Sequence, residues 1–160
     1  MDFAVTMKPV GGPLLFGDTK EGSLGIRVAD SMRVTVEKNA KGQGHIEMSN
    51  GVKDTAAWGK KAEWVDYYGP VDGKTVGIAI FDHPGNPRHP TSWHVRDYGL
   101  FAANPFGKSY FENLPDKHAG DLKMAKGQSL TFRYRFYFHD GDTRQAKVAE
   151  HYQEFAKSDK

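Results

Sequence analysis

The sequence predicts an all-β fold, an antiparallel β-sandwich or barrel with one C-terminal α-helix. Several stretches alternate apolar and polar residues, which is the period of a strand with one buried face. Turn signals separate these stretches, for example "VDG" at 71–73 and "NPFG" at 104–107. Because the connections are short, they favour antiparallel pairing over the long crossovers that parallel sheets need.

Five stretches are expected to form strands because of this alternation. They are, in chain order, "DFAVTM" (2–7), "SLGIRVA" (23–29), "MRVTVE" (32–37), "TVGIAIF" (75–81) and "SLTFRYRFYFH" (129–139). The last is the longest, with Phe132, Tyr134 and Phe136 expected on the buried face. Two further strands are expected at 62–69 and 98–104.

The C-terminal stretch "DTRQAKVAEHYQEFAK" (142–157) is expected to be the helix. Asp142 or Thr143 would serve as its N-cap, and Val148, Tyr152 and Phe155 follow at helical spacing. We expect this apolar stripe to pack on the outside of the sheet. The 160 residues are the length of one ordinary domain, so residues 1–160 are expected to form a single β-sandwich domain.

Composition excludes several classes of function. The net charge is only +2, with basic residues scattered among acidic ones, so nucleic acid is not an expected partner. No apolar run approaches the roughly 20 residues that a membrane helix needs, so no membrane partner is expected. The N-terminus lacks the pattern of a secretory signal, and the chain as given is expected to be soluble and without an export address.

The sequence contains no cysteine, which excludes disulfides, thiolate zinc sites and cysteine nucleophiles. A metal would therefore have to be held by His, Asp or Glu side chains. The sequence leaves the cofactor open, with copper, zinc or calcium as candidate divalent metals.

The stretch "FDHPGNPRHPTSWHVRDYG" (81–99) concentrates titratable groups on a segment that proline makes rigid. Pro84 ends the preceding strand, and Pro87 and Pro90 fix further backbone angles, so the loop loses little entropy when its side chains are held in place. If "WHVRDYG" returns as a strand, His94 and Arg96 share one face. The same groups could form no more than a hydrogen-bonded structural network, and His45, His118, His139 and His151 are taken as surface or core residues.

Three chemistries could use this segment. His83, His89 and His94 could hold a zinc, copper or iron ion. Alternatively, a neutral histidine paired with Asp97 or Asp66 could move protons, with Arg96 or Arg88 steadying an oxyanion. Two carboxylates could instead hydrolyse a glycoside, and the candidates for this role are Asp66, Asp82, Asp97 and Glu63.

Aromatic residues around the same central stretch favour a carbohydrate ligand. Exposed rings beside Asp, Asn and Arg are a common way to bind sugar rings. The residues concerned are Trp58, Trp64, Tyr67, Tyr68, Trp93, Tyr98 and Phe106.

Three stretches resemble the bacterial PmoA-like family, whose members carry the label "methane oxygenase PmoA". They are "FGDTKEGSLGIRVAD" (16–30), the block 57–107 that contains "FDHPGNPRHPTSWHVRDYG", and "GQSLTFRYRFYFHDGD" (127–142). The resemblance implies a β-sandwich of the mutarotase-like or jelly-roll-like kind, a link to polysaccharide degradation, and a chain that matches the C-terminal half of longer, periplasmic or secreted relatives. Methane oxidation is not carried over, because that name belongs to a protein of transmembrane helices. The family's first block falls on Asp18, Lys20, Glu21 and Arg27, and its central block falls on Asp66, Asp82, His83, Asn86, Arg88, His89, Trp93, His94, Arg96, Asp97 and Asn104.

From the residues and the resemblance together, we expect a carbohydrate-processing enzyme, a hydrolase or lyase acting on a glycoside or an oxidised sugar. The alternatives are a copper- or iron-dependent oxidase or monooxygenase with histidine ligands, and a non-catalytic carbohydrate-binding module. A homo-oligomer is a further expectation, because a missing N-terminal half would expose sheet edges. The predicted catalytic residues are His83, His94, Arg96, Asp97 and Asp66; the predicted substrate-binding residues are Arg88, Asn86, Trp64, Trp93, Tyr67 and Asn104; the predicted metal ligands are His83, His89 and His94.

Overall fold

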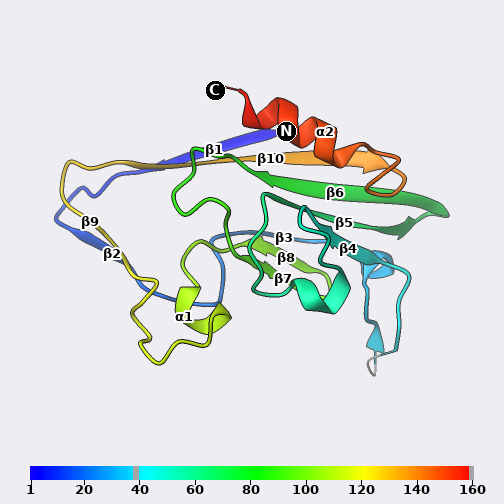
Figure 1. Ribbon diagram of the computed structural model, residues 1–160, viewed down its shortest axis with the longest axis horizontal. Coiled ribbons are helices and arrows are strands. Elements are labelled where there is room, and N and C mark those ends of the chain that lie inside the picture. The colour runs from blue at the N-terminus through cyan, green and yellow to red at the C-terminus, as the bar shows by residue number, and fades with distance from the viewer. Residues whose placement is uncertain (38–39, 159–160) are drawn as a thin grey trace.

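Two antiparallel sheets face each other across the core of the protein, in a computed structural model that describes residues 1–37 and 40–158 (Figure 1). The larger sheet has the order β1-β10-β6-β5-β4, and the smaller has the order β3-β8-β7. A separate β2-β9 pair extends from one end. The strands are β1 (Asp2–Met7), β2 (Leu14–Phe16), β3 (Leu24–Arg27), β4 (His45–Met48), β5 (Trp64–Val71), β6 (Lys74–Asp82), β7 (Trp93–Val95), β8 (Leu100–Ala103), β9 (Leu122–Met124) and β10 (Leu130–Asp140). This architecture confirms the predicted all-β sandwich with antiparallel pairing.

The core lies between the two sheets and is built from the alternating faces of their strands. Val65 and Tyr67 of β5 and Ile80 of β6 face Trp93 of β7 and Phe101 of β8. All five side chains are buried, since every second residue of these strands points to the same face. The alternation read in "SLTFRYRFYFH" is confirmed, because β10 contributes its predicted apolar face to this core.

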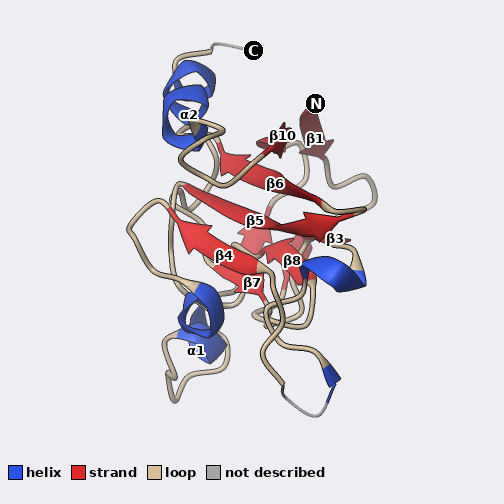
Figure 2. Cartoon of the chain, turned by 90° about the vertical axis from the view of Figure 1, so that its right-hand side faces the viewer, coloured by secondary structure: helices blue, strands red, loops and turns tan. Residues whose placement is uncertain are grey.

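Helix α2 (Val148–Ala156) covers the outer face of the five-stranded sheet (Figure 2). Its residues Val148, Tyr152 and Phe155 form a second buried cluster with Trp64 and Phe81 of the sheet. The Tyr152 ring meets the Phe81 ring edge-on, with 5.8 Å between their centroids. The centre of this sheet is therefore buried on both faces, and the predicted packing of the helix is confirmed.

The predicted strand at 32–37 is wrong. A short 3-10 helix, η1 (Asp30–Met32), includes the first residue of this segment, and within the described residues only Thr35 makes an isolated bridge, to Lys41. The backbone N–H groups of Val34 and Thr35 both donate to the carbonyl of Asp97. These N–H groups bond to a loop of the other sheet and not to a neighbouring strand. The segment therefore does not join a sheet, despite its alternating pattern.

The helix begins at Val148 and not at residue 142 as expected. The carboxylate of Asp142 accepts the N–H groups of Arg144 and Gln145, which closes a turn that is not continued as an α-helix. Lys147 then takes a left-handed conformation with φ of 51°. The other helices, α1 (Lys108–Phe111) and the 3-10 helix η3 (Asp54–Ala57), are one turn long, and no helix in residues 1–37 and 40–158 is long and apolar enough to cross a membrane.

Candidate functional site

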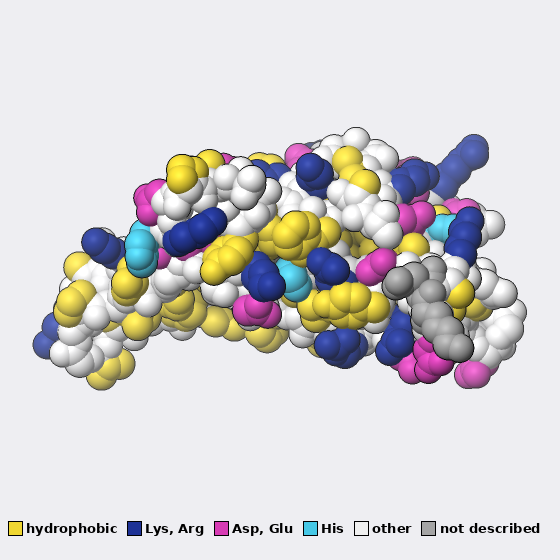
Figure 3. Space-filling model, turned by 90° about the horizontal axis from the view of Figure 1, so that it is seen from below, with side chains coloured by type: hydrophobic (Ala, Val, Ile, Leu, Met, Phe, Trp, Pro, Cys, Tyr) yellow, Lys and Arg dark blue, Asp and Glu magenta, His cyan; other side chains and the backbone are white. Residues whose placement is uncertain are grey.

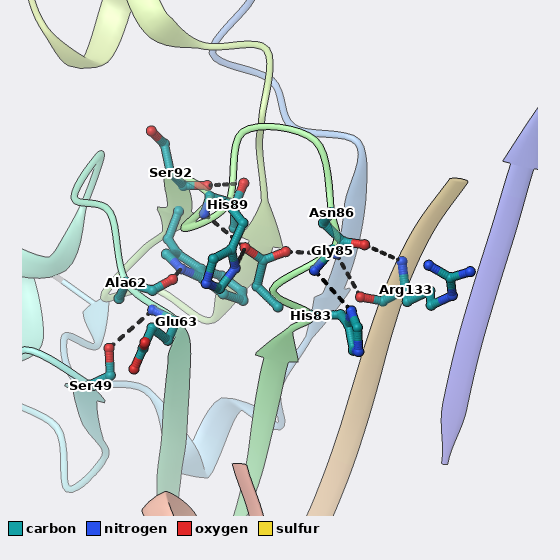
Figure 4. A network of polar contacts seen from close by, with 12 residues as sticks. Ser49, Ala62, Glu63, His83, Gly85, Asn86, His89, Ser92 and Arg133 are labelled. Carbon is teal, nitrogen blue, oxygen red and sulfur yellow. Dashed lines mark hydrogen bonds and ion pairs between the residues drawn. The ribbon is translucent and has the colours of Figure 1, made fainter. Parts of the chain in front are cut away.

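The loop between β6 and β7 is organised around the carboxylate of Asp82, which is fully buried. Figure 4 shows Asn86 and His89 of this loop and the hydrogen bonds that their side chains make. One oxygen accepts the side-chain amide of Asn86 at 2.7 Å. The other accepts Nδ1–H of His89 at 2.8 Å and the backbone N–H of Thr91 at 2.9 Å. Among the titratable side chains of the stretch, His89 is thus paired with an internal carboxylate that holds the loop in one shape.

Two residues predicted to bind substrate, Asn86 and Arg88, connect this loop to other parts of the chain through hydrogen bonds. The Asn86 side chain accepts from the backbone N–H of Arg133 at 2.7 Å and donates to the carbonyl of the same residue at 2.6 Å. The Arg88 guanidinium donates to the carbonyls of Pro105, Gly120 and Asp121. Both side chains therefore hydrogen-bond to the backbone of distant segments, and Asn86 also donates to Asp82.

His83 joins the loop to the C-terminal end of α2. Its Nδ1 accepts the backbone N–H of Gly85 at 3.0 Å, and its Nε2 lies 3.0 Å from the carbonyl of Ser158. Its ring meets the Phe155 ring edge-on. This places His83 on the helix-covered side of the sandwich, whereas His94 lies on β7 in the opposite sheet.

The predicted metal site of His83, His89 and His94 is therefore wrong as a cluster. The three imidazoles bind Ser158, Asp82 and Trp58 respectively, on separate sides of the fold. Among the residues that the structure describes, no three His, Asp or Glu side chains are grouped so that they could hold a metal ion.

Asp66, a predicted catalytic carboxylate, lies buried under the turn that precedes α2. It accepts from Nε2 of His139 at 2.9 Å and from the hydroxyl of Thr143 at 2.7 Å. The side chains of Asp66 and His139 are almost completely buried. The three side chains form a closed polar cluster, so the structure gives Asp66 a structural role in place of the predicted catalytic one.

The Asp66–His139 pair predicts a pH-dependent stability. Burial disfavours the charged imidazole, but the hydrogen bond to Asp66 and its negative charge outweigh burial and raise the pKa of His139. Protonation of His139 thus stabilises the folded state. This contribution to stability is complete below about 6.5, the pKa of a histidine in the unfolded chain. It is lost as the pH rises through the pKa of His139 in the folded protein.

We therefore expect the free energy of unfolding, measured in urea, to fall as the pH is raised from about 6.5, and to fall less in His139→Gln. The pKa of His94 is lowered, so His94 changes the free energy of unfolding below about pH 6.5. Its contribution therefore does not overlap with that of His139. Equal slopes in the two proteins above this pH would contradict the assignment.

Five further residues that were predicted to belong to the site also make structural contacts within the fold. Tyr67 donates to backbone carbonyls at the β7–β8 turn, and burial raises its pKa to about 12. Asn104 is fully buried and donates to the carbonyl of Thr19, and the carboxylate of Asp97 accepts from the Thr35 hydroxyl. Trp64 lies beneath α2 and Trp93 lies in the main core, which explains why neither ring is free to contact a sugar.

His94 and Arg96 do share a face, as predicted, and this face is the outer side of the three-stranded sheet. The indole N–H of Trp58 donates to Nδ1 of His94 at 3.0 Å. The proton of the neutral ring is thereby placed on Nε2. Burial, together with the positive charge of Arg96, lowers the pKa of His94, so this imidazole is neutral near pH 7.

The Arg96 guanidinium lies between two aromatic rings. It is 5.5 Å from the centroid of Trp58 and 5.3 Å from that of Tyr98. Arg27 approaches the Tyr98 ring at 6.0 Å. Neither arginine makes an ion pair with a carboxylate in the described part of the chain.

A hollow of about 350 Å³ lies over β3 and β8 of the same sheet, and Arg27 belongs to its lining. Gly25 and Ala102 line it and stand in register with His94 across the strands. A side chain at position 25 would come within 3.1 Å of the Ala102 methyl group, so the small residues keep the sheet surface low here. Figure 3 views the molecule from this side and shows basic, acidic, histidine and apolar side chains mixed on one face.

Glu21 and Arg27 also line the hollow, and the charges of Glu21 and Lys20 both act on the titration of His94. We call the group Glu21, Arg27, Trp58, His94, Arg96 and Tyr98 the outer-face site. Reasoning from residue types alone gave Glu21 and Arg27 no role. The resemblance placed both in "FGDTKEGSLGIRVAD", which was the one signal that could have pointed to them.

Comparison with known protein families matches residues 1–153 to a family of unknown function, DUF6807. The chain belongs to the DUF6807 family. The DUF6807 match covers the outer-face site and the loop around Asp82 alike. No curated protein and no solved structure matches the chain. The resemblance to PmoA-like proteins stays a prediction.

Proposed function

We propose that the protein is a carbohydrate-processing enzyme of the lyase type, and that an oxidised sugar binds at the outer-face site through its carboxylate. The observation that carries this proposal is the Arg96 guanidinium, which lies between two aromatic rings and next to a neutral histidine, with no carboxylate partner among the described residues. Such a cation is available to an anionic ligand from outside the chain.

The residue types fit this ligand class. A guanidinium presents parallel N–H donors that match the two oxygens of a carboxylate. Tyr98 is 40% exposed and gives an apolar surface next to these donors, as sugar rings require. The hollow beside Glu21 supplies the room for the ring.

The chemistry that suits this set is removal of the proton next to the sugar carboxylate. The Glu21 carboxylate accepts that proton, while Arg96 and the Nε2–H group of His94 stabilise the negative charge that develops on the carboxylate oxygens. The electron pair of the broken C–H bond forms a C=C bond, and the C–O bond at the neighbouring carbon breaks. The leaving oxygen then takes a proton from Glu21, which returns the site to its starting state.

A neutral histidine suits the role of charge stabilisation better than that of a proton acceptor. Trp58 occupies Nδ1, so the only proton of the ring points away from Trp58 on Nε2. A neutral imidazole with a lowered pKa can polarise an oxygen without giving up its proton.

The test is turnover of oligosaccharides that contain uronic acids, followed by the ultraviolet absorbance of the conjugated C=C product. We expect turnover of these substrates and none of the neutral oligosaccharides. In Arg96→Gln we expect kcat/KM to fall about 100-fold, as on loss of one oxyanion donor. Arg144→Gln is the matched control, because Arg144 is exposed and lies in the turn before α2, and it should leave kcat/KM unchanged.

Unchanged turnover in Arg96→Gln, or equal turnover of neutral and acidic sugars, would refute this proposal. If acidic glycans raise the melting temperature without being converted, the protein is a binding module instead.

A further inference from the structure

A second hollow, of about 370 Å³, lies beside the loop around Asp82 and shares no lining residue with the hollow of the outer-face site. Lys61, Arg88, His89, Ser92 and Lys108 supply its polar lining. None of the residues that line it is Asp or Glu. We propose that it binds an oxyanion, the phosphate or carboxylate group of a small-molecule ligand.

Charge is the first argument for an oxyanion. Lys108 is exposed and makes no ion pair in the part of the chain that the structure describes, while Lys61 lies 3.3 Å from Glu112. Arg88 donates to backbone carbonyls and makes no direct ion pair with any described residue, although Asp18 and Asp121 act on it from nearby. The lining therefore presents more positive than negative charge to the hollow, which favours an anion.

The fixed orientation of His89 is the second argument. Its Nδ1–H group donates to the fully buried carboxylate of Asp82 at 2.8 Å, which sets the angle of the ring. Its Nε2 has no hydrogen-bond partner among the described residues, and the ring borders the hollow. Because Asp82 engages Nδ1, Nε2 is the ring nitrogen that is left to contact a ligand in the hollow.

The third argument is size together with a free hydroxyl. Ser92 lies next to Lys61 in the lining, since an isolated bridge pairs the two residues, and its hydroxyl has no side-chain acceptor among the described residues. A volume of about 370 Å³ is in the range of small-molecule sites and exceeds what a bare ion fills. The oxyanion is therefore one group of a larger ligand.

The test is an NMR titration of the protein with inorganic phosphate and, separately, with acetate, each against chloride at equal ionic strength. We expect saturable shifts of the backbone amides of Ser92, Lys108 and Ala119. In the double variant Lys61→Gln/Lys108→Gln the dissociation constant should rise about tenfold or more, because two charged donors are lost. Both side chains are exposed, so the double variant should keep the fold.

Two controls separate this hollow from other basic sites. Lys126→Gln changes an exposed lysine in the turn before β10 and should leave the dissociation constant unchanged. Arg96→Gln should leave it unchanged too, which keeps the result independent of the proposed lyase activity. Tighter binding of phosphate assigns a phosphate ligand, and tighter binding of acetate assigns a carboxylate. If neither anion shifts these amides beyond chloride, or if the double variant binds as tightly as the wild type, the proposal is overturned.

Discussion

Asp82→Ala is expected to lower the free energy of unfolding by about 4 kcal/mol. The wild-type carboxylate is fully buried and accepts three hydrogen bonds, from Asn86, His89 and Thr91. Alanine removes all three acceptor contacts and leaves buried donors without partners, each of which costs about 1–3 kcal/mol. Urea unfolding of the two proteins measures the difference.

Asp140→Ala is the matched control for this prediction. Asp140 is the last residue of β10, its side chain is exposed, and it makes no side-chain hydrogen bond or ion pair among the described residues. Its replacement should change the free energy of unfolding by less than about 0.5 kcal/mol. An Asp82→Ala protein as stable as the Asp140→Ala protein would show that the loop does not depend on its central carboxylate.

The strands that the sequence predicted correctly are those in which one face meets the core. In β10, the alternation of Phe132, Tyr134 and Phe136 with arginines reports burial directly. At Val34 the same alternation failed, because its backbone N–H bonds to the carbonyl of Asp97, which is far away in the sequence. Local pattern reports which face is apolar, but it does not report which backbone groups a distant loop will satisfy.

The candidate site was predictable in part for a similar reason. His94 and Arg96 lie two positions apart near one strand, so their shared face followed from geometry alone, and the structure confirms it through their common neighbour Trp58. Glu21 lies in the turn before β3 and Arg27 ends that strand, and the pairing of β3 with β8 and of β8 with β7 brings them near. The sequence also predicted functional roles for residues that make structural hydrogen bonds, namely His83, Asp66 and Asn86. Residue type does not separate the two cases, because a buried polar residue needs hydrogen-bond partners whether it serves structure or chemistry.

Trp93→Ala is expected to destabilise the protein by about 4 kcal/mol, as for other fully buried large aromatic residues. The sequence suggested a sugar platform at this position, but the side chain is fully buried between the two sheets. Its ring lies 5.9 Å from that of Phe101, and its indole N–H donates to the carbonyl of Ala62 at 2.9 Å. Truncation would open a cavity in the core and leave that carbonyl without its donor.

The exposed aromatic residue Phe138 provides the comparison for Trp93, and it separates a core role from a surface role. Phe138 lies near the end of β10 and is 59% exposed, so Phe138→Ala should change the free energy of unfolding by less than about 0.5 kcal/mol. Urea unfolding of both variants checks the pair. If Trp93→Ala were as stable as Phe138→Ala, the ring could not be filling the space between the sheets, because no cavity in a close-packed core forms without cost.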